Sequence, residues 1–478
     1  MRVLMVASEA HPFIKTGGLG DVMGSLPKAL NEKDINVRVI LPKYKDINLN
    51  LNDRLEFIKS FYIKIGWRNQ YCGIFKCIYK GVEYYFVDNE YYFKRDEPYG
   101  HYDDAERFIF FNKVVMEFIK EMDWRPDIIH CNDWQTGMIP VMYRLEYKDK
   151  EMYKDIKTFF SIHNLSFQGT FSPDILPELL GYNYEPYLNK SLELYGGVSF
   201  LKGGINYSDQ ITTVSNTYAN EIQTPQYGEK LDGLLEHRSY ALKGILNGID
   251  YEEYNPEIDE YIYKKYSIET AYDKKINKEC LQMELGLPVN KDIPIIGIVS
   301  RLTHQKGCDL LINSLDRLLQ KNIQVVILGT GDSVYEETLR KFNYIYHDKV
   351  SVNIDFNNEL AHKIYAGADL FLMPSLFEPC GLGQLISLKY GTIPIVRETG
   401  GLKDTVFPYN KYTGEGNGFT FKNYNVNEII HIVQYALNIY ENKYIWNSLI
   451  EKAMKSDNSW QRSARKYKEL YIGIMNEK

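Results

Sequence analysis

The sequence has few cysteines, no long apolar run and no block of like charge. Its six cysteines are scattered through 478 residues without a C-x-x-C pair, which argues against a zinc site or a disulfide framework and favours a reducing compartment. No stretch approaches the ~20 uninterrupted apolar residues of a membrane helix. The net charge of −7 is spread along the chain and offers no basic surface to nucleic acid or anionic lipid. We therefore expect a cytoplasmic protein with a small or neutral partner, no nucleic acid and no membrane.

The first residues lack the pattern of a signal peptide, because the apolar run at Met1–Ala7 is short and Ser8 and Glu9 follow at once. We interpret this segment as a β-strand.

Tyrosine is abundant, with 40 residues against five tryptophans, and could supply platforms for sugar rings. The tyrosines are spread through Lys-, Asn- and Ile-rich segments, which favours compositional drift over such platforms.

Short β-branched runs alternate with amphipathic stretches along almost the whole chain, a pattern typical of parallel sheets flanked by helices. In the first half, strands are expected at Val3–Ala7, Val37–Leu41, Asp127–His130, Thr158–Ile162 and Gln210–Val214. Apolar residues recur at helical spacing over Ala105–Met122. The segment Tyr71–Val87 instead alternates about Gly81 and predicts a hairpin inserted into the parallel pattern.

A second series begins near Lys243–Asp250. Its strands are expected at Ile293–Ser300, Gln324–Leu328, Val350–Ile354, Leu370–Met373 and Ile393–Val396. The predicted fold class is α/β, with two doubly wound Rossmann-like domains at 1–243 and 244–458 and a C-terminal helix at 459–478. Because ligands of such sheets bind outside the carboxyl ends of the strands, we expect the two sheets to face each other across a cleft.

A glycine-rich loop, Lys15-Thr16-Gly17-Gly18-Leu19-Gly20-Asp21, follows the first strand and leads into a helical stretch. Glycines let backbone amides approach a ligand closely, and a helix N-terminus favours an anion. A mere tight turn is one alternative and a dinucleotide fingerprint is another. We reject the fingerprint because the glycines begin several residues past the strand and Leu41-Pro42-Lys43 stands where a ribose-binding acid is wanted.

Two cations, Arg301 and Lys306, lie between the strand that ends near Ser300 and the next helix. A planar guanidinium and a compact ammonium suit a diphosphate. One charge pair near 4 Å is worth roughly 4 kcal/mol at an effective dielectric of 20. On these two residues alone, a pair of solvated surface cations remains an equal alternative.

Glu378 follows another expected strand and precedes the helix-initiating run Pro379-Cys380-Gly381-Leu382-Gly383. A carboxylate at a strand end suits sugar hydroxyls, and the helix N-terminus beside it suits phosphate. A further glycine turn, Glu398-Thr399-Gly400-Gly401, follows the next strand. Loops of this kind after strands in both halves of the chain favour a functional interpretation over chance.

Five motifs together closely resemble those of bacterial glycogen synthases and plant starch synthases. They are Lys15-Thr16-Gly17-Gly18-Leu19, Ser161-Ile162-His163-Asn164, Ser300-Arg301-Leu302-Thr303 with Gln305-Lys306-Gly307, Phe377-Glu378-Pro379-Cys380-Gly381 and Glu398-Thr399-Gly400-Gly401. The likeness runs from the first strand to Trp460 and Gln461. It implies the GT-B fold and a retaining transfer of glucose from ADP-glucose to the non-reducing end of an α-1,4-glucan such as glycogen, with release of ADP.

The resemblance also implies roles for the matching positions. Catalytic roles fall to Glu378, Arg301, Lys306 and His163. Substrate-binding positions on the first, acceptor-side domain are Lys15, Gly17, Gly18, Asp21, Asp133 and Asn164. Those on the second, nucleotide-sugar-binding domain are Asn247, Phe356, Cys380, Gly381, Leu382, Gly383, Thr399, Gly400 and Gly401.

Within this set, Lys15 with the Gly17 and Gly18 amides is expected at the diphosphate and donor sugar, and Glu378 at the donor-sugar hydroxyls. The amides of 380–383 are expected near phosphate. For the Cys380 thiol itself, packing is favoured over a nucleophilic role because no histidine is evident beside it in the sequence. In this fold the C-terminal helix crosses back to the first domain.

Three positions depart from the family pattern. Phe356 stands where a tyrosine commonly stacks on adenine, so the ring face is kept and the hydroxyl is lost. Asp355 replaces a small residue, and Gly383 stands where threonine is frequent. These changes bear on the preference for ADP-glucose over UDP-glucose rather than on the transfer itself.

The sequence contains no Asp-x-Asp pair, which nucleotide-sugar enzymes that rely on Mg²⁺ or Mn²⁺ typically show. We expect no metal and no other cofactor, with the cationic loops taking over the charge role. A covalent route needs two carboxylates about the anomeric carbon, and only Glu378 lies near the donor motif. We therefore favour same-face substitution, in which the leaving phosphate helps take the acceptor proton.

Other functions are compatible with parts of the pattern. One is the same transfer from UDP-glucose, and another is a different GT-B glucosyltransferase that shares Glu378, Arg301 and Lys306 but not the Lys15 loop. A glucan phosphorylase would need a pyridoxal-bearing lysine and a much longer chain. A non-catalytic glucan-binding protein would be expected to lack the phosphate-facing residues. The oligomeric state is not predicted.

Overall fold

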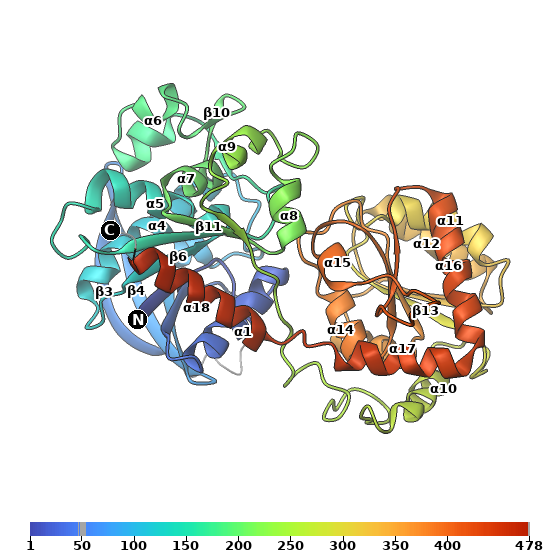
Figure 1. Ribbon diagram of the computed structural model, residues 1–478. Coiled ribbons are helices and arrows are strands. Elements are labelled where there is room, and N and C mark those ends of the chain that lie inside the picture. The colour runs from blue at the N-terminus through green and yellow to red at the C-terminus, as the bar shows by residue number, and fades with distance from the viewer. Residues whose placement is uncertain (46, 48–53, 477–478) are drawn as a thin grey trace. The chain divides into compact units, whose positions relative to one another are not determined.

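The computed structural model describes residues 1–45, 47 and 54–476, and the chain divides into two compact units (Figure 1). The first unit comprises Met1–Ile245 together with Trp460–Lys478, and the second comprises Leu246–Ser459. Among the described residues, no helix has both the length and the apolar character needed to cross a bilayer.

The first unit is built on a nine-stranded sheet with the order β12-β11-β7-β6-β1-β2-β5-β4-β3. Its strands are β1 (Arg2–Val6), β2 (Asn36–Pro42), β3 (Glu56–Ile65), β4 (Arg68–Tyr79), β5 (Val82–Asp88), β6 (Ile128–Asn132), β7 (Lys157–Ile162), β11 (Gln210–Thr213) and β12 (Leu242–Gly244). All pairs are parallel except β3 with β4 and β4 with β5. The predicted hairpin is confirmed: Tyr79 pairs with Val82, and Gly81 takes φ +77° in the turn between them.

Helices cover both faces of this sheet. They are α1 (Gly18–Asn31), α3 (Glu90–Phe93), α4 (Asp104–Phe118), α5 (Met138–Met142), α6 (Glu185–Leu188), α7 (Phe200–Tyr207), α8 (Asn216–Glu221), α9 (Asp232–His237) and α18 (Trp460–Asn476). A small sheet of β8 (Thr170–Phe171), β9 (Glu193–Leu194) and β10 (Gly197–Ser199) lies outside the main one. Alternate residues of β1 enter different cores, since Leu4 and Val6 pack with α4 and α5, whereas Val3 and Met5 pack with α1 and α18.

The C-terminal helix α18 lies against α1 within the first unit (Figure 1). Its apolar stripe buries Trp460, Tyr467, Tyr471 and Ile474 in the core that also holds Val3 and Met5. The Tyr471 hydroxyl lies 2.7 Å from Nδ1 of the buried His130 on β6. The last helix of the chain therefore completes the core that its first strand begins.

The second unit has a six-stranded, wholly parallel sheet with the order β15-β14-β13-β16-β17-β18. Its strands are β13 (Ile295–Val299), β14 (Gln324–Leu328), β15 (Val350–Asn353), β16 (Leu370–Met373), β17 (Ile393–Arg397) and β18 (Phe419–Phe421). Its helices are α10 (Lys274–Glu284), α11 (Cys308–Leu318), α12 (Ser333–Ile345), α13 (Asn358–Gly367), α14 (Gly383–Lys389), α15 (Gly400–Thr405), α16 (Val426–Glu441) and α17 (Lys443–Lys455). One face packs on α10 and α13 and the other on α11, α14, α16 and α17.

Every strand expected from the sequence is present, with ends displaced by at most two residues. The expected helix at Ala105–Met122 is α4 followed by a 3₁₀ turn at Ile119–Glu121. Three strands of the two large sheets were not expected: β3, β12 and β18. The α/β class and the two doubly wound sheets are confirmed.

Candidate active site

The first candidate edge lies at the carboxyl ends of β1, β6 and β7. β1 is bordered by β2 on one side and β6 on the other, so the chain leaves in opposite directions from neighbouring strands. Such a switch point leaves a crevice where open α/β sheets bind ligands. The loops that follow these three strands carry Lys15, Asp133 and His163, which is the arrangement that the sequence pattern predicts.

The Lys15 loop is held in place by two carboxylates. Lys15 Nζ lies 2.6 Å from Asp21 Oδ1 in the first turn of α1. Glu9, which follows β1, accepts hydrogen bonds from the Thr16 amide and hydroxyl and, at 3.3 Å, from the Gly17 amide. The Gly17 amide, expected at the diphosphate, is thus directed to Glu9. At Gly18 a Cβ would meet nothing within 4 Å, so the first residue of α1 faces open space.

Asp133 and His163 form a second cluster on the same edge. The Asp133 carboxylate accepts the His163 amide at 2.8 Å, and Asp133 itself has a left-handed backbone with φ +55°. His163 Nε2 lies 2.9 Å from Oδ1 of Asn132, whose amide group donates to the carbonyl oxygen of Val6 at 3.1 Å. The last residue of β6 therefore fixes the imidazole against the end of β1. Asn164, next in the chain, accepts the Ser166 amide at 3.1 Å.

Burial shifts the proton affinities of this cluster. It raises the pKa of the Asp133 carboxyl to about 7, although the amides of His163 and Asn164 oppose the shift. It lowers the pKa of the His163 imidazole to about 4. At neutral pH the imidazole is therefore uncharged and suited to hydrogen bonding with hydroxyl groups.

The second candidate edge lies at the carboxyl ends of β13 and β16, the switch point of the second sheet. Lys306, from the loop after β13, and Glu378, from the loop after β16, form an ion pair with Nζ 2.6 Å from Oε2. The Ser375 hydroxyl donates to the same oxygen at 3.2 Å, and Glu378 is buried. Arg301 on the first of these loops is exposed. The sequence-predicted cations and carboxylate thus meet on one edge.

Glycines bring these loops together through close backbone contacts. Gly307 has φ +76°, and a Cβ there would lie 2.2 Å from the carbonyl oxygen of Pro374. Gly400 has φ +44°, and its Cβ would lie 1.9 Å from the carbonyl oxygen of Glu378. The Gly401 amide donates to that same carbonyl at 3.1 Å. The Gly400-Gly401 turn therefore supports the backbone of Glu378, and Thr399 is the N-cap of the short helix α15.

The remaining predicted positions of the second unit are Asn247, the residues 380–383 before and at the start of α14, and Phe356 beyond β15. Cys380 is buried, its thiol accepts the Asn247 amide, and burial raises its pKa to about 12, which fits a packing role. Gly381 has φ +74° and Leu382 caps α14, whose first residue is Gly383. A Cβ on Gly383 would lie 2.9 Å from the ring of Phe371, which accounts for glycine here. Phe356 lies beyond β15 and is 83% exposed.

Sequence reasoning missed several residues of these edges. Glu9 and Asn132 are single polar residues without a motif. Only their burial marks them, Glu9 after β1 and Asn132 at the end of β6. The loop after β14 was also missed. It contains Gly329, whose Cβ would lie 1.8 Å from the Ser300 carbonyl oxygen, and Thr330, whose carbonyl oxygen accepts the Leu302 amide at 2.8 Å. Its Gly329-Thr330-Gly331 run follows a strand, which is the pattern that identified the other glycine loops.

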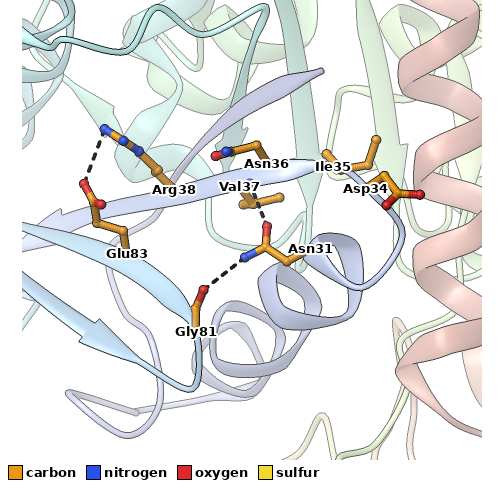
Figure 2. Close-up of a pocket in the computed structure, with 8 residues that line it drawn as sticks. All are labelled: Asn31, Asp34, Ile35, Asn36, Val37, Arg38, Gly81 and Glu83. Carbon is orange, nitrogen blue, oxygen red and sulfur yellow. Dashed lines mark hydrogen bonds and ion pairs between the residues drawn. The ribbon is translucent and has the colours of Figure 1, made fainter.

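A hollow of about 420 Å³ lies elsewhere in the first unit (Figure 2). It is lined by Asn31, Asp34, Ile35, Asn36, Val37, Arg38, Gly81 and Glu83. The side chain of Asn31 bridges the Val37 amide and the Gly81 carbonyl oxygen, and Arg38 pairs with Glu83 at 3.3 Å. This hollow is at the amino end of β2, the edge opposite the glycine loop, and so is separate from the candidate site.

No group of three or more His, Cys, Asp or Glu side chains suited to a metal ion occurs among the described residues.

Two family models match the chain, one in each unit. The model described as a starch synthase catalytic domain matches residues 2–237, and the model described as glycosyl transferases group 1 matches residues 286–454. The chain is 64% identical over 471 residues to a glycogen synthase of Clostridium perfringens, covering 98% of both chains. It is 62% identical over 472 residues to a glycogen synthase of Clostridium botulinum, covering 98% of this chain and 99% of the relative.

Two solved structures are also similar to this chain. The catalytic domain of starch synthase IV from Arabidopsis thaliana, bound to ADP and acarbose, matches with a TM-score of 0.92 and 33% identity over 99% of both chains. A sucrose-phosphate synthase from Thermosynechococcus elongatus matches with a TM-score of 0.62 over the whole of both chains, at 15% identity, and so shares the fold alone.

Proposed function

The chain belongs to the family of bacterial glycogen synthases and plant starch synthases, and from this membership we propose that it extends α-1,4-glucans with glucose from ADP-glucose, releasing ADP. It is a glycosyltransferase with the GT-B fold. The observation that carries the proposal is the Lys306–Glu378 ion pair at the switch point of the second sheet, with Arg301 exposed on the same loop. This edge offers a carboxylate to a sugar and two cations to its leaving diphosphate.

The leaving group is the first requirement of the reaction. As the bond from glucose to diphosphate lengthens, negative charge develops on the phosphate oxygen. Arg301 and Lys306 are proposed to stabilise that charge together with the amides of 380–383. The Lys15 loop of the first unit is likewise proposed to bind diphosphate. Cationic groups fixed before the reaction act more strongly than mobile water, because they need no reorganisation.

Glu378 is proposed to hold the donor sugar. Both Lys306 and Ser375 contact its Oε2, so Oε1 is the oxygen offered to sugar hydroxyls. Burial of the carboxylate strengthens such hydrogen bonds relative to water. His163, neutral at physiological pH, is proposed to contact glucosyl or acceptor hydroxyls, with Asn132 fixing its ring.

Retention at the anomeric carbon is proposed to arise from same-face substitution. Glu378 is assigned to sugar binding, and its loop after β16 supplies no second carboxylate that could form a covalent intermediate. The acceptor hydroxyl then attacks from the side of the departing diphosphate, whose oxygen takes its proton. Detection of a glucosyl adduct on any side chain during turnover would contradict this route.

The alternative donor is UDP-glucose. Phe356, expected at the nucleobase, is 83% exposed and offers a ring face without a hydroxyl, so we propose that it accepts either base by stacking. The preference for adenine is supported here by family membership and by the solved starch synthase, whose bound nucleotide is ADP.

The test is the incorporation of labelled glucose into glycogen from ADP-glucose and UDP-glucose, compared side by side. We expect kcat/KM for ADP-glucose to exceed that for UDP-glucose by at least about tenfold, which corresponds to ~1.4 kcal/mol of transition-state binding. A preference for UDP-glucose would favour the alternative donor. Glycogen binding without transfer from either donor would identify a glucan-binding protein.

A further inference from the structure

Glu9 is a buried carboxylate that belongs to none of the motifs. It follows β1 at the switch point of the first sheet and is 4% exposed. A carboxylate is rarely buried unless its oxygens are paired or hydrogen-bonded. Its partners therefore indicate what it does.

The hydrogen bonds that Glu9 accepts tie it to the Lys15 loop. Its Oε2 accepts the Thr16 amide, the Thr16 hydroxyl at 3.0 Å and the Gly17 amide at 3.3 Å. Gly17 is the N-cap of α1 and has no side chain with which to cap the helix. Glu9 thus accepts, from outside the helix, the amides of the N-cap residue Gly17 and of Thr16 before it; accepting the N-cap amide is the role of the carboxylate in a capping box.

The loop needs such an anchor because of its composition. Gly17 and Gly18 are adjacent, and glycine gives up more backbone freedom on ordering than other residues. Two residues before Gly17 stands Lys15, whose ammonium lies 2.6 Å from Asp21. A shift of Thr16 or Gly17 would therefore move Lys15 on one side and the first turn of α1 on the other.

We propose that Glu9 is a positioning residue for the donor, whose carboxylate ties down Thr16 and Gly17 so that Lys15 and the Gly18 amide are held ready for the diphosphate. The inference rests on the role proposed above for the Lys15 loop. Gly18 faces open space and is the first residue of a 14-residue helix, so its amide has no partner within the helix. Glu9 itself acts through the loop and need not touch the substrate.

The position of the loop does not depend on the negative charge of Glu9. A negative group behind a diphosphate site repels the ligand, and burial together with the charge of Asp21 raises the pKa of the Glu9 carboxyl. What the loop requires is an acceptor oxygen at the right reach. Glutamine keeps this oxygen and its distance, whereas aspartate keeps the charge but is one methylene too short.

The experiment compares Glu9→Gln, Glu9→Asp and Glu9→Ala with the wild type, and uses Glu151→Gln, an exposed carboxylate of the same unit, as the matched control. The readouts are KM for ADP-glucose, KM for glycogen and kcat, with the affinity for ADP measured by calorimetry. We expect Glu9→Ala and Glu9→Asp to raise KM for ADP-glucose and weaken ADP binding at least about tenfold, because the hydrogen bonds that hold Thr16 and Gly17 are lost. KM for glycogen should stay unchanged, and Glu9→Gln should stay within about threefold of wild type.

A merely structural role would lower the amount of folded enzyme and leave the donor KM unchanged, because KM does not depend on active enzyme concentration. If the three variants keep the wild-type KM for ADP-glucose and affinity for ADP, the inference is overturned. A larger loss in Glu9→Gln than in Glu9→Asp would also overturn it, since charge rather than reach would then matter. Lys15→Ala tests the role of Lys15 independently of Glu9. An unchanged KM for ADP-glucose in that variant would refute the role proposed for Lys15.

Discussion

At the scale of single residues, the charged and polar side chains of the candidate site are held by contacts with neighbouring side chains. Glu378 is paired with Lys306, Lys15 with Asp21, and the imidazole of His163 with Asn132. These contacts hold each group in place before a ligand arrives. Such preorganisation is what lets fixed charges act on a transition state without first having to reorient.

Asp133 makes stability depend on pH. Its folded-state pKa of about 7 lies above its ordinary value of 3.8, so between about pH 4 and 7 the folded protein holds a proton that the unfolded chain has lost. The free energy of unfolding that this group contributes therefore falls as pH rises through that window, by up to ~1.4 kcal/mol per unit, and levels off above it. Asp133→Asn cannot ionise, yet its side-chain oxygen can still accept the His163 amide.

The measurement is urea unfolding of the wild type and Asp133→Asn at several pH values from 4.5 to 8, with Asp149→Asn as an exposed control. The stability difference should grow in favour of Asp133→Asn up to about pH 7 and then remain constant. His163 titrates in both proteins, so its effect cancels in the difference. Parallel curves for the two proteins would show that Asp133 is already ionised across the range.

At the scale of elements, α18 adds a buried polar contact to its apolar interface with the rest of the first unit. The Tyr471 hydroxyl is the partner of Nδ1 of His130, and the other ring nitrogen lies 2.7 Å from the hydroxyl oxygen of Ser161. Tyr471→Phe keeps the ring and leaves a buried nitrogen without its partner. We expect it to lower the free energy of unfolding by about 1–3 kcal/mol, as measured by urea denaturation.

Tyr444→Phe is the matched control, because this tyrosine is 86% exposed and its change should stay within about 0.5 kcal/mol. Equal stabilities for the two variants would mean that the His130–Tyr471 contact adds nothing beyond packing of the rings.

The strands also show which parts of the fold can be predicted from the sequence. The central strands β1, β13 and β16 were predicted because they are buried on both faces and read as apolar runs. The edge strand β3 was missed because its burial is slight, so lysines and exposed side chains interrupt the alternation. Lys306 and Glu378 were predicted from strand-end position, whereas Glu9 could not be: its partners depend on the chain turning back after β1.

At the scale of the whole molecule, the two units repeat one design. Each has a sheet with a switch point, glycine-supported loops and a cation within hydrogen-bonding distance of a carboxylate. The family models match one unit each, and the relatives match the chain over both. The resemblance to glycogen synthases therefore extends over both units.

The central claim is that side chains and amides of this chain, rather than a divalent ion, neutralise the departing diphosphate. The direct test is the initial rate of labelled glucose transfer from ADP-glucose to glycogen in excess EDTA, for the wild type, Lys306→Gln and the exposed control Lys341→Gln. We predict an undiminished rate for the wild type and the control, and a kcat lower by about 10²–10³ for Lys306→Gln. A wild-type rate that collapses in EDTA and returns with Mg²⁺, or a fully active Lys306→Gln, would contradict the account.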